Sequence, residues 1–140
     1  MAFADCISGR RGLVLGVAND RSIAWGIAQV LHQGGARLGF TYQGERLERR
    51  VRPLAEQVDG EILLPCDVSD ESQIEELFAA VDEKWGGLDF LVHSIGFADK
   101  GELQKIVLIH ILNRSDQCFL FLQSEQIIRS IPWNIFRYTL

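Results

Sequence analysis

The sequence predicts an α/β fold, a doubly wound sheet in which helices cover both faces of parallel strands. A short apolar run, residues 13–15, ends in Gly16, and a helical pattern begins at Ser22 after a five-residue turn. Short apolar stretches and amphipathic stretches continue to alternate up to Gly96. The connections are long enough for the crossovers that parallel pairing needs. These observations together predict the order βαβαβαβ, half of a doubly wound sheet, with the strands arranged 3-2-1-4.

Size and composition predict one soluble globular domain. The chain has 140 residues, of which 47% are hydrophobic and 24% charged. The net charge of −5 argues against nucleic acid as the main partner. The longest apolar run, Cys118–Leu122, is too short to cross a membrane, and no signal-peptide pattern precedes the first strand. Cys6, Cys66 and Cys118 form no metal-binding pattern, which favours reduced thiols in a cytoplasmic protein.

The first helix follows the glycine turn and ends at Gly34–Gly35. Ser22 is a plausible N-cap, and Gly26 is expected to let the helix lie close to the sheet. Apolar residues at helical spacing predict its buried face: Ile23, Ile27, Val30 and Leu31. Arg10 and Arg11, which lead into the first strand, are interpreted as a solvated edge.

The later elements follow the same alternation. Their predicted positions are strands at 37–42, 61–65 and 88–95 and helices at 47–58 and 70–85. Pro53 either kinks the second helix or marks its true first turn. Asp70 and Gln73 have the spacing of a capping box at the start of the third helix.

Small or polar residues follow each predicted strand, where doubly wound sheets bind ligands. They are Gly16 to Ser22, Tyr42–Gln43, Cys66–Val68 and Ser94–Gly96. A glycine turn that leads into a helix N-terminus is a ready site for a pyrophosphate. The spacing is Gly-x5-Ser-x3-Gly, not the common G-x-G-x-x-G, so this turn by itself also fits an α/β protein without a nucleotide. With all four strand ends considered, the sequence favours a Rossmann-type dinucleotide site.

Four motifs carry a resemblance to a known family. They are G-V-A-N-D-R-S-I-A-W-G-I-A from Gly16, T-Y-Q from Thr41, C-D-V from Cys66 and H-S-I-G-F-A from His93. Together they resemble the bacterial NADH-dependent enoyl-[acyl carrier protein] reductases, divergent members of the short-chain dehydrogenase/reductase superfamily. The resemblance covers Ser8 to Leu103, so residues 1–103 are predicted to form a dinucleotide-binding half-domain.

The resemblance implies an activity, a cofactor and an assembly. The activity is reduction of the enoyl double bond on acyl carrier protein in type II fatty acid synthesis. The cofactor is NADH or NAD, and the whole enzymes of the family form homotetramers.

The resemblance also implies the cofactor-binding residues: Gly16, Ser22, Ile23, Gln43, Asp67, Val68, Ser94, Ile95 and Gly96. The Ser22 hydroxyl and the Ile23 N–H would donate to the pyrophosphate. Gln43 would hydrogen-bond the ribose hydroxyls. Because its neutral amide does not repel a 2′-phosphate, NADPH remains an alternative cofactor. Asp67 and Val68 would flank the adenine, the alternative for Asp67 being a loop or helix-capping aspartate. The segment 94–96 would line the path toward the nicotinamide.

The catalytic pair of the family is missing from these 140 residues. The family implies a tyrosine and a lysine with six residues between them, but the only tyrosines here are Tyr42 and Tyr138 and no lysine stands at that spacing. His93 lies within a predicted strand and is interpreted as a packed core histidine. No catalytic residue is therefore assigned, and the chain is predicted to be inactive by itself.

Residues 104–140 form an atypical tail with neither glycine nor alanine. We hypothesise that the reading frame changes near Gln104–Lys105, which the coding DNA would test; an unusual natural C-terminus is the alternative. The predicted strand 88–95 is expected to have one edge without its usual neighbour in the family and to be exposed there, and the chain to be unable to form the tetramer. Two other readings are a non-catalytic NAD(H)-binding module and a non-functional truncated product.

Overall fold

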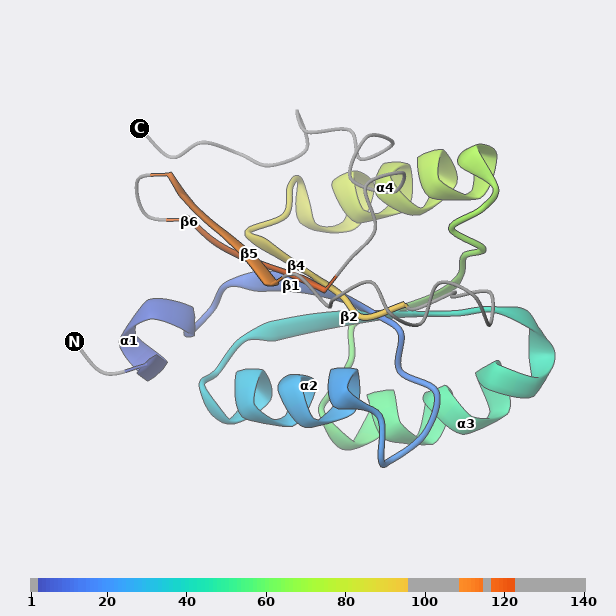
Figure 1. Cartoon of the computed structure of the whole chain (residues 1–140), viewed down its shortest axis with the longest axis horizontal. Coiled ribbons are helices and arrows are strands. Elements are labelled where there is room, and N and C mark those ends of the chain that lie inside the picture. The colour runs from blue at the N-terminus through green and yellow to red at the C-terminus, as the bar shows by residue number, and fades with distance from the viewer. Residues whose placement is uncertain (1–2, 96–108, 115–116, 123–140) are drawn as a thin grey trace.

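The computed structural model of the chain describes residues 3–95, 109–114 and 117–122. Four parallel strands form the centre of its sheet: β1 (Arg11–Leu15), β2 (Arg37–Tyr42), β3 (Ile62–Pro65) and β4 (Phe90–His93). Their order is β3-β2-β1-β4 (Figure 1). The predicted α/β class and strand order are confirmed.

Helices cover both faces of this sheet. They are α1 (Phe3–Ile7), α2 (Ile23–Gln33), α3 (Gly44–Gln57) and α4 (Glu71–Trp85). Figure 1 shows α2 and α3 on one face and α4 on the opposite face. One core cluster, with Phe40 and Trp25, lies on the α2–α3 side, and another, with Leu77 and Val81, lies on the α4 side. The short α1 stands where the sequence indicated only a lead-in.

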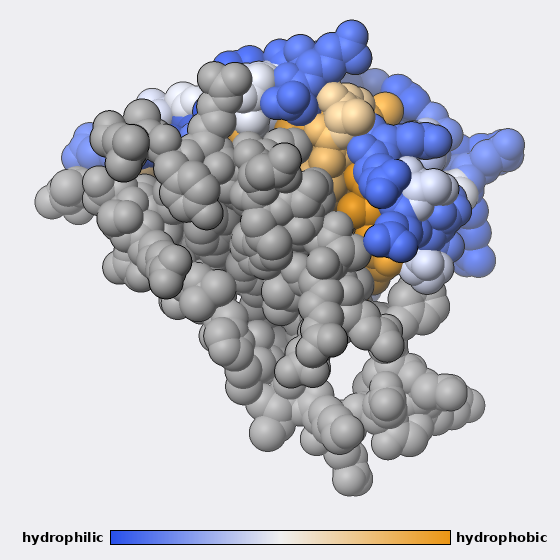
Figure 2. Space-filling view, turned by 90° about the horizontal axis from the view of Figure 1, so that it is seen from above, coloured by the Kyte–Doolittle hydropathy of each residue, from blue (hydrophilic) through white to orange (hydrophobic). Residues whose placement is uncertain are grey.

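The solvent face of α4 is polar, as an amphipathic helix requires. In the coloured part of the view from above, hydrophilic residues dominate and a band of apolar residues lies beside them (Figure 2). Asp70 caps α4 by accepting a hydrogen bond from Ser72 N at 3.0 Å. Gln73 departs from the predicted capping box, because its Oε1 accepts from Asp67 N at 2.8 Å. In α3, Pro53 lies inside the helix and not in its first turn.

The buried face of α2 differs from the predicted one. Ile23 is 71% exposed and Val30 53% exposed. The buried residues of α2 are Ala24, Trp25, Ala28 and Leu31. Gly26 also faces open space, because a Cβ there would have no heavy atom within 4 Å. Alanines let the helix approach the sheet closely, and they carry too weak a hydropathy signal to have indicated this face.

The fourth strand does not have the exposed edge that the sequence predicted; whether its neighbour is the usual one of the family stays a prediction. β6 (Gln117–Leu122) pairs in parallel with β4, with Val92 opposite Leu120, and β5 (Ile109–Arg114) pairs antiparallel with β6. The sheet of the described residues therefore has the order β3-β2-β1-β4-β6-β5. An unpaired strand edge exposes N–H and C=O groups, and the β-prone run at 117–122 supplies their partners.

A polar cluster joins the amino ends of the strands to the end of α4. The Glu61 carboxylate accepts from Arg37 Nε and Nη2, both at 2.8 Å, and from Trp85 Nε1 at 2.7 Å. These hydrogen bonds, those from Arg37 first, lower the pKa of Glu61 to about 2. The carboxylate therefore stabilises the fold as an anion.

We expect Glu61→Gln to lower the free energy of unfolding by about 1 kcal/mol at pH 7, a modest value because Arg37 is partly solvated. Since the folded pKa lies below the unfolded one, this contribution is present at neutral pH and is lost as the pH falls from about 4.5 toward 2. Urea unfolding at pH 7 and pH 3 measures it. Glu75→Gln, at an exposed position of α4, is the control, and equal losses in the two variants would contradict the prediction.

Candidate cofactor site

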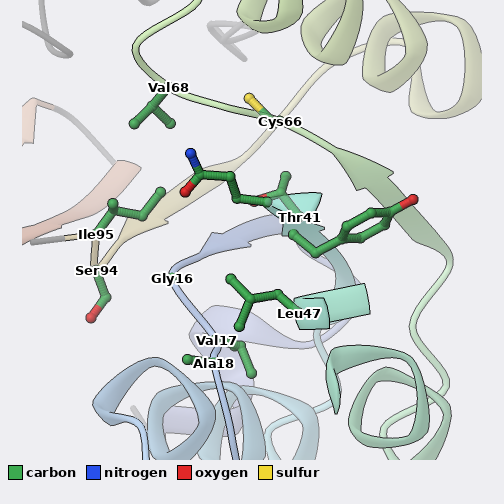
Figure 3. Close-up of a pocket in the computed structure, with 11 residues that line it drawn as sticks. Gly16, Val17, Ala18, Thr41, Leu47, Cys66, Val68, Ser94 and Ile95 are labelled. Carbon is green, nitrogen blue, oxygen red and sulfur yellow. The ribbon is translucent and has the colours of Figure 1, made fainter. Parts of the chain in front are cut away.

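A cleft of about 290 Å³ opens where the carboxyl ends of the parallel strands meet (Figure 3). Five of the residues predicted for the cofactor line it: Gly16, Gln43, Val68, Ser94 and Ile95. They come from the segments that follow β1, β2, β3 and β4, within three residues of each strand's end. The tertiary structure thus brings together segments that lie up to 79 residues apart in the chain, from Gly16 to Ile95. Gly96 lies outside the described residues.

Gly16 allows the end of β1 to touch the end of β4. Its φ of +104° lies in a region that L side chains rarely adopt. A Cβ at this position would lie 2.2 Å from the Ser94 carbonyl oxygen. Ser94 N in turn donates to the Leu15 carbonyl at 2.9 Å. The backbone at the floor of the cleft therefore needs a glycine at this position.

Ser22 and Ile23 lie at the start of α2, outside the cleft lining. The Ser22 hydroxyl donates to the Asn19 carbonyl at 2.5 Å and accepts from Ala18 N at 3.3 Å. Ser22 occupies the N-cap position, but its side chain makes no capping hydrogen bond. Its hydroxyl instead closes the turn that leads from the cleft into α2.

Gln43 and Asp67 join the ends of β2 and β3 at the rim of the cleft. Gln43 Nε2 donates to Asp67 Oδ2 at 2.8 Å, beside a backbone hydrogen bond from Cys66 N to the Tyr42 carbonyl at 2.9 Å. Asp67 Oδ1 accepts from Ser69 Oγ at 2.6 Å and from Ser69 N at 2.9 Å. The hydroxyl and then the N–H of Ser69 lower the pKa of Asp67, so its carboxylate is ionised at neutral pH. The N-cap of α4 is Asp70, not Asp67.

The walls of the cleft are largely apolar. Val68 and Ile95, labelled in Figure 3, are half-buried and pack against the core cluster on the α4 side. Cys66 is 3% exposed, and burial, followed by the nearby Asp67 and Asp70, raises the pKa of its thiol to about 11. This thiol is therefore protonated at neutral pH and is no nucleophile.

Six further residues line the cleft: Val17, Ala18, Thr41, Tyr42, Leu47 and Cys66. Five of them lie inside the motifs that begin at Gly16, Thr41 and Cys66, and all of these five except Thr41 stand in the strand-end segments where the sequence predicts ligand binding, although none was predicted to contact the cofactor. Leu47 is different, because it enters the cleft from the first turns of α3.

His93 lies in β4 opposite Leu15 and is 2% exposed, which confirms the prediction of a packed core histidine. Among the described residues, no group of three or more His, Cys, Asp and Glu side chains could hold a metal ion. Within the same residues, every helix is too short or too polar to cross a membrane.

A family model described as enoyl-(acyl carrier protein) reductase matches residues 16–114. The chain is 56% identical over 98 residues to enoyl-[acyl-carrier-protein] reductase [NADH] 2 of Rhizobium meliloti, covering 70% of this chain and 37% of that protein. It is 52% identical over 99 residues to the NADH enzyme FabI of Bacillus subtilis, covering 69% of this chain and 38% of that protein.

Solved structures give the same result. FabI from Candidatus Liberibacter asiaticus superimposes with a TM-score of 0.66 at 53% identity, covering 73% of this chain and 40% of that chain. The reductase of Anaplasma phagocytophilum, solved in complex with NAD, superimposes with a TM-score of 0.66 at 44% identity, covering 71% of this chain and 38% of that chain. The chain thus spans about two-fifths of the length of these relatives.

Proposed function

Because the chain belongs to the enoyl-(acyl carrier protein) reductase family, we propose that its cleft binds NAD(H) as the cofactor-binding half of such an enzyme. One observation carries the proposal. Residues after four parallel strands converge on one cleft, at the edge where doubly wound sheets bind dinucleotides. The apolar walls suit the flat faces of an adenine ring, and the polar rim suits a ribose.

Each end of the cleft has its own proposed role. The turn after Gly16 and the N-terminus of α2 hold the pyrophosphate through backbone N–H groups, the Ile23 N–H included. The Ser22 hydroxyl joins them by turning away from the Asn19 carbonyl, to which it donates without ligand. Ser94 and Ile95, with Gly96 next in sequence, line the path toward the nicotinamide.

The adenosine end is formed by Gln43, Asp67 and Val68. Gln43 serves the ribose hydroxyls, Asp67 accepts from the adenine amine, and Val68 packs on the ring. The NADH named for the relatives supports this cofactor. Gln43 donates one of its two amide N–H groups to Asp67, which leaves one N–H and the carbonyl oxygen for the ribose hydroxyls, and its side chain carries no positive charge for a 2′-phosphate.

Chemical turnover needs groups that these 140 residues do not contain. The family resemblance implies a tyrosine and a lysine separated by six residues, and the sequence has no such pair. We therefore propose that the 140-residue chain binds cofactor in the cytoplasm without reducing an enoyl-acyl carrier protein and without forming the family tetramer. Reduction of the enoyl double bond is proposed for the whole enzyme only.

Calorimetric titration of the 140-residue chain with NADH is expected to give saturable binding with a Kd between about 10 and 1000 µM, equivalent to roughly 4–7 kcal/mol. The affinity is expected to be modest because these 140 residues lack the lysine that, by the family resemblance, holds the nicotinamide ribose. In parallel, NADH absorbance with a crotonyl thioester is expected to stay at the rate of the protein-free control. Absence of binding would overturn the cofactor proposal, and thioester-dependent oxidation would overturn the proposed lack of turnover.

A further inference from the structure

The loop between β3 and α4, residues 66–70, is held by hydrogen bonds that converge on Asp67. Its carboxylate receives three donors, two from Ser69 and one from Gln43. Its backbone N–H donates to Gln73 Oε1 at 2.8 Å, and its carbonyl accepts from Asp70 N at 3.0 Å. Every polar atom of Asp67 is thus engaged, although the residue is half-exposed at the rim of the cleft.

The two carboxylate oxygens of Asp67 differ in how many further hydrogen bonds they can accept. An ionised carboxylate accepts about four hydrogen bonds, two at each oxygen, and donates none. Oδ1 already accepts two, from Ser69 N at 2.9 Å and from Ser69 Oγ at 2.6 Å. Oδ2 accepts one, from Gln43 Nε2 at 2.8 Å. One acceptor position therefore remains, on Oδ2 and next to the Gln43 amide.

Gln73 connects this loop to a rigid element. It lies in the first turn of α4, where its Nε2 donates to Asp70 Oδ2 at 3.0 Å while its Oε1 holds the Asp67 N–H. Asp70 in turn caps α4 through Ser72 N. The Asp67 backbone is thus fixed relative to the helix, and Ser69 fixes the rotation of its carboxylate.

Resting on the proposed NAD(H) site, we propose that Ser69 and Gln73 are positioning residues that select adenine, by directing the free acceptor position of Asp67 Oδ2 at the base. An acceptor-only group pairs with the 6-amino group of adenine and not with the 6-oxo group of hypoxanthine. Loss of Ser69 lets the carboxylate rotate, and loss of Gln73 lets the Asp67 backbone shift relative to α4. Discrimination between the two bases then falls.

The test is calorimetric titration of the 140-residue chain and its variants with NADH and with reduced nicotinamide hypoxanthine dinucleotide. Ser69→Ala is expected to weaken NADH binding about fivefold and the hypoxanthine analogue much less, so that the ratio of the two affinities falls about fivefold. Gln73→Met is expected to change the ratio in the same direction. Ser72→Ala is the matched control, because Ser72 Oγ makes the equivalent 2.6 Å hydrogen bond to Asp70 and does not touch Asp67.

Measuring NADH binding as a function of pH adds a second test, because general loosening of the loop would not shift the pH at which binding is lost. NADH binding is lost as Asp67 becomes protonated, and removal of the Ser69 hydroxyl raises the pKa of Asp67. The acid limb of binding is therefore expected at higher pH in Ser69→Ala than in wild type and Ser72→Ala. Asp70, the other charged group facing this carboxylate, is retained in all three proteins, and only Ser72→Ala removes the hydrogen bond that it accepts from the Ser72 hydroxyl.

The outcomes separate the two proposals. If the wild-type chain binds NADH but Ser69→Ala and Gln73→Met keep its base discrimination and acid limb, the positioning role is wrong and the cofactor site stands. An equal change in Ser72→Ala would also overturn the positioning role. If the wild-type chain binds neither dinucleotide, the proposed function fails and this inference fails with it.

Discussion

Replacement of Gly16 with alanine is expected to abolish measurable NADH binding and to lower the free energy of unfolding by about 3 kcal/mol. The new Cβ would lie 2.2 Å from the Ser94 carbonyl oxygen, and the φ of +104° is strained for any L side chain. Relief of this clash requires the ends of β1 and β4 to separate. The floor of the cleft is lost with that movement. Urea unfolding and calorimetric titration of the same preparation measure the two effects.

Gly26→Ala is the matched control for this prediction. Gly26 is a glycine ten positions further along, within α2, where a Cβ would meet nothing within 4 Å. Alanine is favoured over glycine inside a helix by up to about 1 kcal/mol, so this variant is expected to be as stable as the wild type or more stable. Equal stabilities of the two variants would show that the β1 turn does not depend on glycine.

The second large effect is expected for Asp89→Ala, which should lower the free energy of unfolding by about 3 kcal/mol at pH 7. Asp89 accepts from Arg11 N and Nε, both at 2.8 Å, and from Arg11 Nη2 at 3.1 Å. Its side chain is only 12% exposed. The ion pair joins the start of β1 to the residue before β4. These two paired strands form the floor of the cleft.

The pH dependence of this effect follows from the pKa of Asp89. Burial would raise that pKa, but the hydrogen bonds from Arg11 outweigh burial and lower it. The stabilisation is therefore complete above the unfolded pKa and is lost as the pH falls through the folded one. Thermal unfolding at pH 7 and pH 3 tests this, with Glu83→Ala at an exposed position of α4 as the control. A similar loss at both pH values would contradict the ion-pair account.

The Arg11–Asp89 pair also marks a limit of prediction from sequence. Arg11 was expected at a solvated edge, yet its side chain is 23% exposed and makes three hydrogen bonds to Asp89 and Trp85 groups. Its partners lie more than 70 residues away. No local pattern links an arginine to a carboxylate at that separation.

The α2 helix shows a second limit. Its position and its ends were predictable from Ser22 and the Gly34–Gly35 pair, but its buried face was not. Periodicity favoured Ile23 and Val30, whereas the sheet selected Ala24 and Ala28 because small side chains permit close approach. Packing also decided which glycine is needed: a Cβ at Gly16 would clash with the backbone of Ser94, whereas a Cβ at Gly26 would touch nothing.

By itself, the sequence determined the α/β class, the central strand order and the family, because apolar alternation and the motifs at strand ends are local properties of the chain. It also indicated which strand ends to examine, and nine of the residues at those strand ends line the cleft, five of them predicted to contact the cofactor. Only the tertiary structure decided the neighbour of β4, the buried face of α2 and the hydrogen bonds that fix Asp67. Those three features depend on contacts between distant parts of the chain. Packing in three dimensions decides which of the possible contacts form, and no local sequence pattern encodes that choice.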